Sequence, residues 1–174
     1  MVSTITIFSA CGKTEYRDYR RKVNWSQCSP RLENLNRSKE VIANHLYSLR
    51  SVDIESINRS QFDMEVDTHK WGFDNFEDLF HWSLTSHIGI SVNLLDSLEK
   101  YYKDLESLCD NRDADHYSSN LVRNRISPLY GTYQGFLGTN EYVKFEWIPR
   151  ISLSDSNHLS HTLNNLDNIF PRSK

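Results

Sequence analysis

The sequence predicts an α+β fold: a single domain with a mainly antiparallel sheet packed against two helices. Three observations support this prediction. Apolar residues alternate with polar ones near both ends of the chain, two central segments carry apolar residues at helical spacing, and strands and helices do not alternate regularly. With 174 residues, 38% of them hydrophobic, the chain is long enough for one domain that buries a sizeable core. We therefore expect residues 1–174 to form one globular unit.

The N-terminal half predicts two strands and one helix. Residues 2–8 are rich in β-branched side chains with apolar residues on both faces, which indicates a partly buried strand. Residues 62–66 alternate as a second, short strand would. Between them a helix is expected over about 38–50, capped by Ser38. Its apolar stripe comprises Val41, Ile42, His45, Leu46 and Leu49.

The strongest helical pattern covers about 91–109. Ser91 is placed to cap it, and Asp96 lies four residues before Lys100, the favourable order for an ion pair on a helix. The apolar stripe comprises Val92, Leu95, Leu98, Tyr102, Leu105 and Leu108.

A β-hairpin is predicted over about 129–147. Strands at 129–137 and 141–147 would flank a turn at Gly138-Thr139-Asn140, and Pro149 would end the second strand. From about 154 onward we expect a loosely packed helix, since Leu159, Leu163, Leu166 and Ile169 have roughly helical spacing.

Composition argues against several classes of protein. No apolar run approaches the roughly 20 residues that span a bilayer, so no membrane association is expected. The three cysteines are odd in number and far apart, which favours free thiols in a reducing cytoplasm over a disulfide framework or a zinc knuckle. They are Cys11, Cys28 and Cys109. Since no glycine-rich phosphate loop precedes a helix, we expect no cofactor.

Charge is divided unevenly along the chain. Lys and Arg number nine against four acids in residues 1–50, four against thirteen in 51–110, and seven against six in 111–174, giving +5, −9 and +1. The acidic middle contains the aromatic segment 71–82, WGFDNFEDLFHW. An acidic field of this size would steer a basic partner, and nearby aromatics would anchor it.

Part of this segment is also suited to a core. Phe76, Leu79 and Phe80 have helical spacing, with the acids on the wet side, and Asp74 with Glu77 resembles a helix cap and its acidic partner. Whether the aromatics form core or interface stays open from the sequence.

The first functional hypothesis is a small binding protein that inhibits or neutralises a basic protein, such as a nuclease toxin. In size and charge the chain resembles bacterial toxin-immunity proteins, although no motif is shared. The expected binding residues are acids and aromatics of the middle segment: Asp63, Glu65, Asp67, Trp71, Phe73, Asp74, Glu77 and Asp78.

The alternative hypothesis is an enzyme. His81 with Ser83 and His158 with Ser160 form two His-x-Ser motifs, which resemble those of the two-histidine phosphoesterases. That resemblance implies phosphodiester cleavage, with paired imidazoles as acid and base and hydroxyls on the phosphate oxygens. It requires both motifs to lie on strands, with each histidine and its serine on one face.

Two further interpretations carry less weight. His158 and His161 could share a metal-ligand face on a helix, but no third ligand converges on them in the sequence, so no metal is predicted. Residues 16–22, YRDYRRK, could contact nucleic acid, but the chain is acidic overall, with a pI near 6.1, which argues against that partner.

Overall fold

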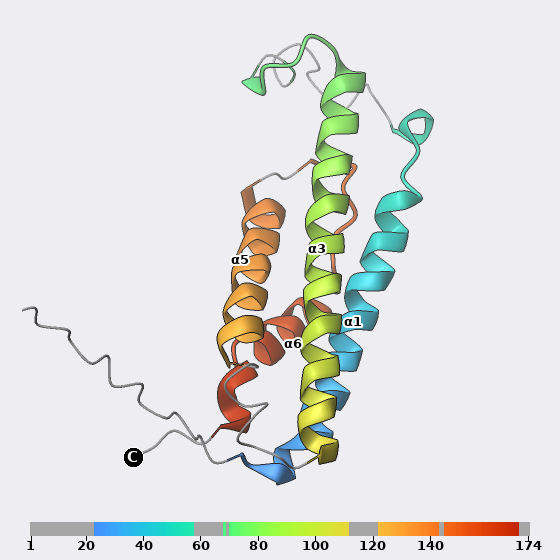
Figure 1. The fold of residues 1–174 in the computed structure, drawn as a ribbon. Coiled ribbons are helices and arrows are strands. Elements are labelled where there is room, and N and C mark those ends of the chain that lie inside the picture. Colours follow the sequence, from blue (N-terminus) through green and yellow to red (C-terminus); the bar gives the residue numbers. More distant parts are fainter. Residues whose placement is uncertain (1–22, 58–67, 69, 112–121, 143–144, 171–174) are drawn as a thin grey trace, which may run out of the picture.

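The computed structural model describes residues 23–57, 68, 70–111, 122–142 and 145–170, and all of the regular secondary structure in these ranges is helical (Figure 1). The elements are η1 (Trp25–Gln27), α1 (Cys28–Arg50), η2 (Ile54–Ser56), α3 (Phe76–Asn111), the π-helical η4 (Val122–Ile126), α5 (Ser127–Tyr142), α6 (Leu153–Leu163) and η5 (Leu166–Ile169). No strand occurs in this part of the chain, so the predicted α+β fold is wrong. The strands expected at 2–8 and 62–66 lie outside the described residues.

Three helices run side by side, and α6 packs across them (Figure 1). α1 and α3 are antiparallel, since the start of one is joined to the end of the other through Cys28 and Cys109. α5 is antiparallel to α3 as well, because Arg125 pairs with Asp104 while Thr132 lies beside Ser97. The arrangement is a helical bundle in which α3 contacts both α1 and α5.

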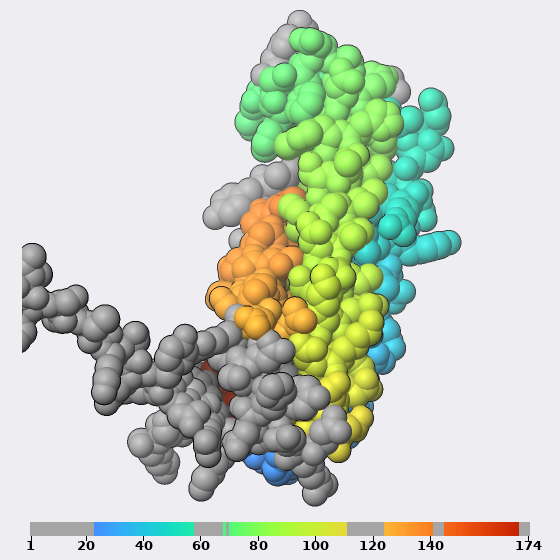
Figure 2. Space-filling model, in the orientation of Figure 1, coloured from blue at the N-terminus to red at the C-terminus, as the bar shows by residue number. Residues whose placement is uncertain are grey.

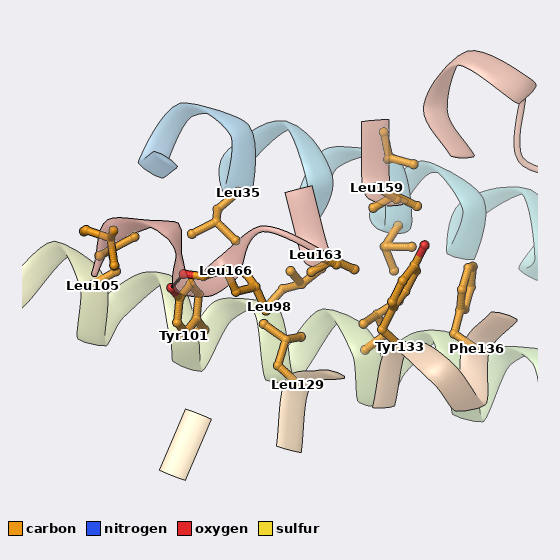
Figure 3. Close-up of a cluster of buried hydrophobic side chains, with 14 of the residues drawn as sticks. Leu35, Leu98, Tyr101, Leu105, Leu129, Tyr133, Phe136, Leu159, Leu163 and Leu166 are labelled. Atoms are coloured by element: carbon orange, nitrogen blue, oxygen red, sulfur yellow. Dashed lines mark hydrogen bonds between the residues drawn. The ribbon is translucent and has the colours of Figure 1, made fainter. Parts of the chain in front are cut away.

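The main core fills the space between these helices (Figure 3). Each helix contributes one apolar stripe at three- and four-residue spacing, as an amphipathic helix should. Tyr101 lies within this core and donates its hydroxyl hydrogen to the Leu166 carbonyl at 2.9 Å, which satisfies the buried phenol. The side chains labelled in Figure 3 come from α1, α3, α5, α6 and η5: Leu35, Leu98, Tyr101, Leu105, Leu129, Tyr133, Phe136, Leu159, Leu163 and Leu166.

The predicted hairpin at 129–147 is replaced by α5 and the turn that follows it. Burial follows the helical period, with Leu129, Tyr133 and Phe136 against the core. The turn predicted at 138–140 is the last part of this helix. Polar side chains there bond back to carbonyls four residues earlier, as Asn140 Nδ2 does to Phe136 at 2.8 Å.

Both predicted helices are present as parts of longer ones. The segment 38–50 is the second half of α1, and 91–109 belongs to α3, which has 36 residues. The tail forms α6 and η5, and it is packed closely: Leu159, Leu163, Leu166 and Ile169 are all buried in the main core. The expectation of loose packing is therefore wrong.

Cys28 and Cys109 form a disulfide, so the expectation of free thiols is wrong for these two residues. Their Cα atoms are 5.9 Å apart although 81 positions separate them in sequence. Antiparallel packing of α1 against α3 brings them together, and sequence spacing does not reveal it. Cys11 lies outside the described residues.

A second, smaller core lies near the start of α3. It comprises Leu49, Leu79, Phe145 and Ile148, with the half-buried Phe73 and Trp147 packed against it. This cluster connects the end of α1, the first turns of α3 and the chain after α5. None of the described helices combines the length and apolar character that crossing a bilayer requires.

Candidate functional site

A tight turn precedes α3 and presents two aromatic residues. The amides of Trp71 and Phe73 both donate to the carbonyl of the buried Thr68, at 3.2 and 2.9 Å. Gly72 lies between them with φ of +77°, a left-handed conformation that glycine adopts without strain. The turn therefore fixes where both aromatic side chains emerge.

The cap of α3 is formed by Asn75 and Asp78. Asn75 Oδ1 accepts the Asp78 amide at 2.9 Å, and Asn75 Nδ2 donates to the Asp78 carboxylate at 2.8 Å. The expected pairing of Asp74 with Glu77 is thus displaced by one residue. Because a carboxylate in the first helical turn is stabilised by the helix dipole, Asp78 has a structural role as well as a charge.

The aromatic residues of 71–82 divide between core and surface. Phe76 and Phe80 are buried together with Leu79, as their helical spacing indicated. Trp71 and Trp82 are 38% and 40% exposed, while Phe73 is half-buried. The segment occupies one end of the molecule in Figure 2. It is therefore partly core and partly surface.

The exposed rings belong to a continuous array. Trp82 has two ring neighbours: Phe73, at 5.3 Å between ring centroids, and Trp71, at 6.0 Å. Trp71 is 5.5 Å from Phe145, which in turn stacks on Trp147 at 4.5 Å with planes only 11° apart. Such neighbouring rings stabilise one another in tilted and stacked geometries.

Trp147 anchors this array to α3. Its indole Nε1 donates to Ser83 Oγ at 3.0 Å, and Ser83 Oγ donates to the Phe80 carbonyl at 2.9 Å. The ring also meets Phe76 edge-on at 5.3 Å. The two exposed indoles thus rest on a buried layer whose orientation is fixed by packing and hydrogen bonds.

Exposed carboxylates occur in the same segment as the rings. Asp74, Glu77 and Asp78 are all exposed, whereas Lys70 is the one exposed cation in the described part of 68–82. Within the described structure we define the acidic-aromatic surface as Trp71, Phe73, Asp74, Glu77, Asp78 and Trp82. The remaining predicted binding residues, Asp63, Glu65 and Asp67, lie outside the described residues.

The two His-x-Ser motifs lie on helices, not strands. Residues two apart on an α-helix project about 200° from one another. Accordingly His81 is exposed on α3, whereas Ser83 is buried beneath Trp147. The same-face arrangement that the enzyme hypothesis required is therefore absent from this motif.

The second motif serves helix packing. His158 Nε2 donates to the Asn34 carbonyl at 3.1 Å and lies 3.3 Å from Ser38 Oγ, which joins α6 to α1. Ser160 Oγ accepts from Asn164 at 3.2 Å near the end of α6. Neither motif presents an imidazole and a hydroxyl toward a common space.

Two other histidines are more unusual, and sequence reasoning placed one of them, His45, only in an apolar stripe. His45 on α1 and His87 on α3 are 5% and 2% exposed, and neither Nε2 atom has a hydrogen-bond partner. His87 donates its Nδ1 hydrogen to the Ser83 carbonyl at 2.8 Å. Burial lowers the pKa of His45 to about 4, with a smaller contribution from His87, and burial also lowers the pKa of His87.

Two clefts lie on either side of Arg150 and Ile151. One, of about 320 Å³, separates α1 from the start of α6 and includes Arg37, His45 and Asp155. The other, of about 200 Å³, lies between α5 and α6 beside Phe136. Among the described residues no group of three or more His, Cys, Asp or Glu side chains is arranged to hold a metal ion.

Comparison with known proteins finds no matching family model, no similar curated protein and no similar solved structure.

Proposed function

We propose that this chain is a binding protein whose acidic-aromatic surface captures, and thereby inhibits, a basic protein. The observation that carries the proposal is the pair of adjacent exposed indoles, Trp71 and Trp82, set among exposed carboxylates. Tryptophan is enriched among residues that dominate binding energy at interfaces, and an acidic rim accelerates encounter with a basic surface.

In the folded bundle these side chains are also held in one arrangement before any partner arrives. The turn at Gly72 fixes Trp71 and Phe73, and the Trp147–Ser83 hydrogen bond fixes the layer beneath. Rigid side chains lose little conformational entropy on association, so more of their contact energy appears as affinity.

The enzyme hypothesis is less well supported, because neither His-x-Ser motif has the geometry it requires. The narrower expectation of a toxin-immunity protein stays a prediction. The alternative nucleic-acid contact at residues 16–22 lies outside the described residues.

The cytoplasmic location also stays a prediction, and the Cys28–Cys109 disulfide argues for an oxidising compartment instead. Non-reducing and reducing mass analysis of the protein isolated from its own cells distinguishes the two locations. An intact disulfide favours the oxidising compartment, and free thiols favour the cytoplasm.

The test of the proposed function is capture of a partner by the tagged chain, co-expressed with its genomic neighbours, followed by measurement of association rates with the purified pair. A double variant, Asp74→Lys with Glu77→Lys, reverses charge beside the indoles and leaves the Asn75–Asp78 cap intact. We expect a stoichiometric basic partner whose association slows about tenfold at low salt in this variant.

The matched control is Glu33→Lys with Asp110→Lys, which makes the same change in net charge near the disulfide. Both residues are exposed, one on α1 and the other in the last turn of α3. The control should associate at close to the wild-type rate. Equal slowing by both double variants, or no basic partner at all, rejects the proposal.

A further inference from the structure

We infer that the outer faces of Trp71 and Trp82 bind arginine side chains by cation–π contact, with the adjacent carboxylates completing the charge balance. This inference rests on the proposed function, since it specifies which groups of the basic partner the surface takes. The chemistry is that of a guanidinium against an indole face; tryptophan is the aromatic residue that attracts cations best, and arginine is the cation found most often in such contacts.

The ring geometry determines where the cation can lie. The centroids of Trp71 and Trp82 are 6.0 Å apart and their planes are tilted by 39°. A guanidinium placed between two rings needs about 7 Å, twice the van der Waals spacing of roughly 3.5 Å. The indoles therefore offer separate outward faces and not a closed cage, which suits two arginines better than one enclosed ammonium.

Nearby carboxylates lie where they can complete such contacts. Asp78 is one helical turn before Trp82, so both project from the same side of α3. Asp74 directly follows Phe73, whose ring is 5.3 Å from that of Trp82. Arginine can stack on a ring and donate to a carboxylate at once, whereas the compact, strongly hydrated lysine ammonium does so less well.

Each indole is also packed against other rings. Trp82 has Phe73 and Trp71 as neighbours, and Trp71 has Phe145. Even so, Trp71 and Trp82 stay 38% and 40% exposed, so part of each indole is accessible to a cation.

The direct test uses peptides in place of the unidentified partner. The probes are acetylated and amidated Gly-Arg-Gly-Arg-Gly, its lysine counterpart and its citrulline counterpart, which keeps the shape of arginine without the charge. Each is titrated into the ¹⁵N-labelled full chain, and the four indole N–H signals are followed by NMR. Assignment uses single Trp→Phe variants.

We expect millimolar arginine peptide to shift the Trp71 and Trp82 signals, the lysine peptide to shift them less, and the citrulline peptide hardly at all. Trp25, beside the disulfide, and Trp147, in the layer beneath, serve as internal references. Equal shifts with citrulline and arginine, or no shift of Trp71 and Trp82 with arginine, overturn the inference.

Two substitutions separate π character from apolar contact. Trp82→Leu keeps an apolar side chain without a ring, whereas Trp82→Phe keeps a ring. Loss of one cation–π contact should weaken arginine-peptide binding about 2- to 10-fold in the leucine variant, with partial rescue by phenylalanine. Equal affinity of the two variants contradicts the inference.

The arginine inference and the proposed function can be rejected independently. If arginine selectivity is absent while Asp74→Lys with Glu77→Lys still slows partner association, the inference fails and the proposed function stands. If the charge-reversed variant associates normally as well, both are rejected.

Discussion

His45 on α1 and His87 on α3 interact electrostatically inside the bundle, and the Nε2 atoms of both lack hydrogen-bond partners. The Phe136 ring of α5 meets His45 edge-on at 5.9 Å. Because a charged imidazole would be desolvated there and would repel its neighbour, both histidines favour the neutral form. The bundle thus contains a pair of groups that resist protonation.

Stability should fall in mild acid for this reason. The pKa of His45 is lowered from 6.5 to about 4, so between these values the unfolded chain takes up a proton that the folded chain refuses. Above pH 6.5 His45 does not change the unfolding free energy. Below about pH 4 the destabilisation that it causes is complete, at up to about 3 kcal/mol. Urea unfolding of wild type and His45→Leu from pH 7 to 4 measures this, and the variant should have a shallower slope.

The control for that experiment is the exposed His81→Leu, which removes an imidazole from the surface of α3. Its pH slope should match that of the wild type. If His45→Leu retains the full wild-type slope, burial of His45 does not cause the acid sensitivity.

Reduction of the Cys28–Cys109 disulfide should destabilise the bundle strongly. Without the cross-link, the loop of 81 residues is free in the unfolded chain. In the loop-closure model, the entropy that the unfolded chain gains lowers the unfolding free energy by about 4 to 5 kcal/mol. The measurement is the unfolding free energy of Cys28→Ser with Cys109→Ser against the oxidised wild type. A change below about 1 kcal/mol would mean that the disulfide does not constrain the unfolded chain.

Two glycines should respond in opposite directions to alanine. Gly135 is exposed within α5 and a Cβ there meets nothing within 4 Å, so Gly135→Ala should stabilise by about 0.5 to 1 kcal/mol through helix propensity. Gly72 has equally open surroundings but a φ of +77°, so Gly72→Ala should destabilise by about 1 kcal/mol. Thermal melts measure both effects: the melting temperature should rise in Gly135→Ala and fall in Gly72→Ala. Shifts of the same sign would contradict this account.

The sequence predicted helices where one apolar stripe was long and unambiguous. It failed over α5, because the turn-like Gly138-Thr139-Asn140 and the alternation of Val143, Phe145 and Trp147 just after it suggested a hairpin. Helix propensity is weak in such a segment. Packing of Leu129, Tyr133 and Phe136 against the core decides its structure, and that packing is a tertiary effect.

In the candidate site, the helical pattern of the sequence separates core rings from an exposed ring. Phe76, Leu79 and Phe80 fall on one helical stripe and are buried, whereas Trp82 falls outside that stripe, one turn after Asp78. A helical projection of 76–91 would have separated the core rings from the exposed one. The contact of Trp147 with Ser83 joins residues 64 positions apart, and no local pattern indicates it.

The existence of two separate apolar clusters has a consequence for the order in which the molecule opens. The main cluster lies in the same part of the bundle as the disulfide, while the small cluster around Leu79 and Ile148 stabilises the other end of α3 without a covalent link. Proteins open in cooperative units whose free energies differ, and the less constrained unit opens first. We expect backbone amides near Leu79 to exchange with deuterium well before those near Tyr101, so the first turns of α3 would fray and re-form many times during one lifetime of the folded bundle.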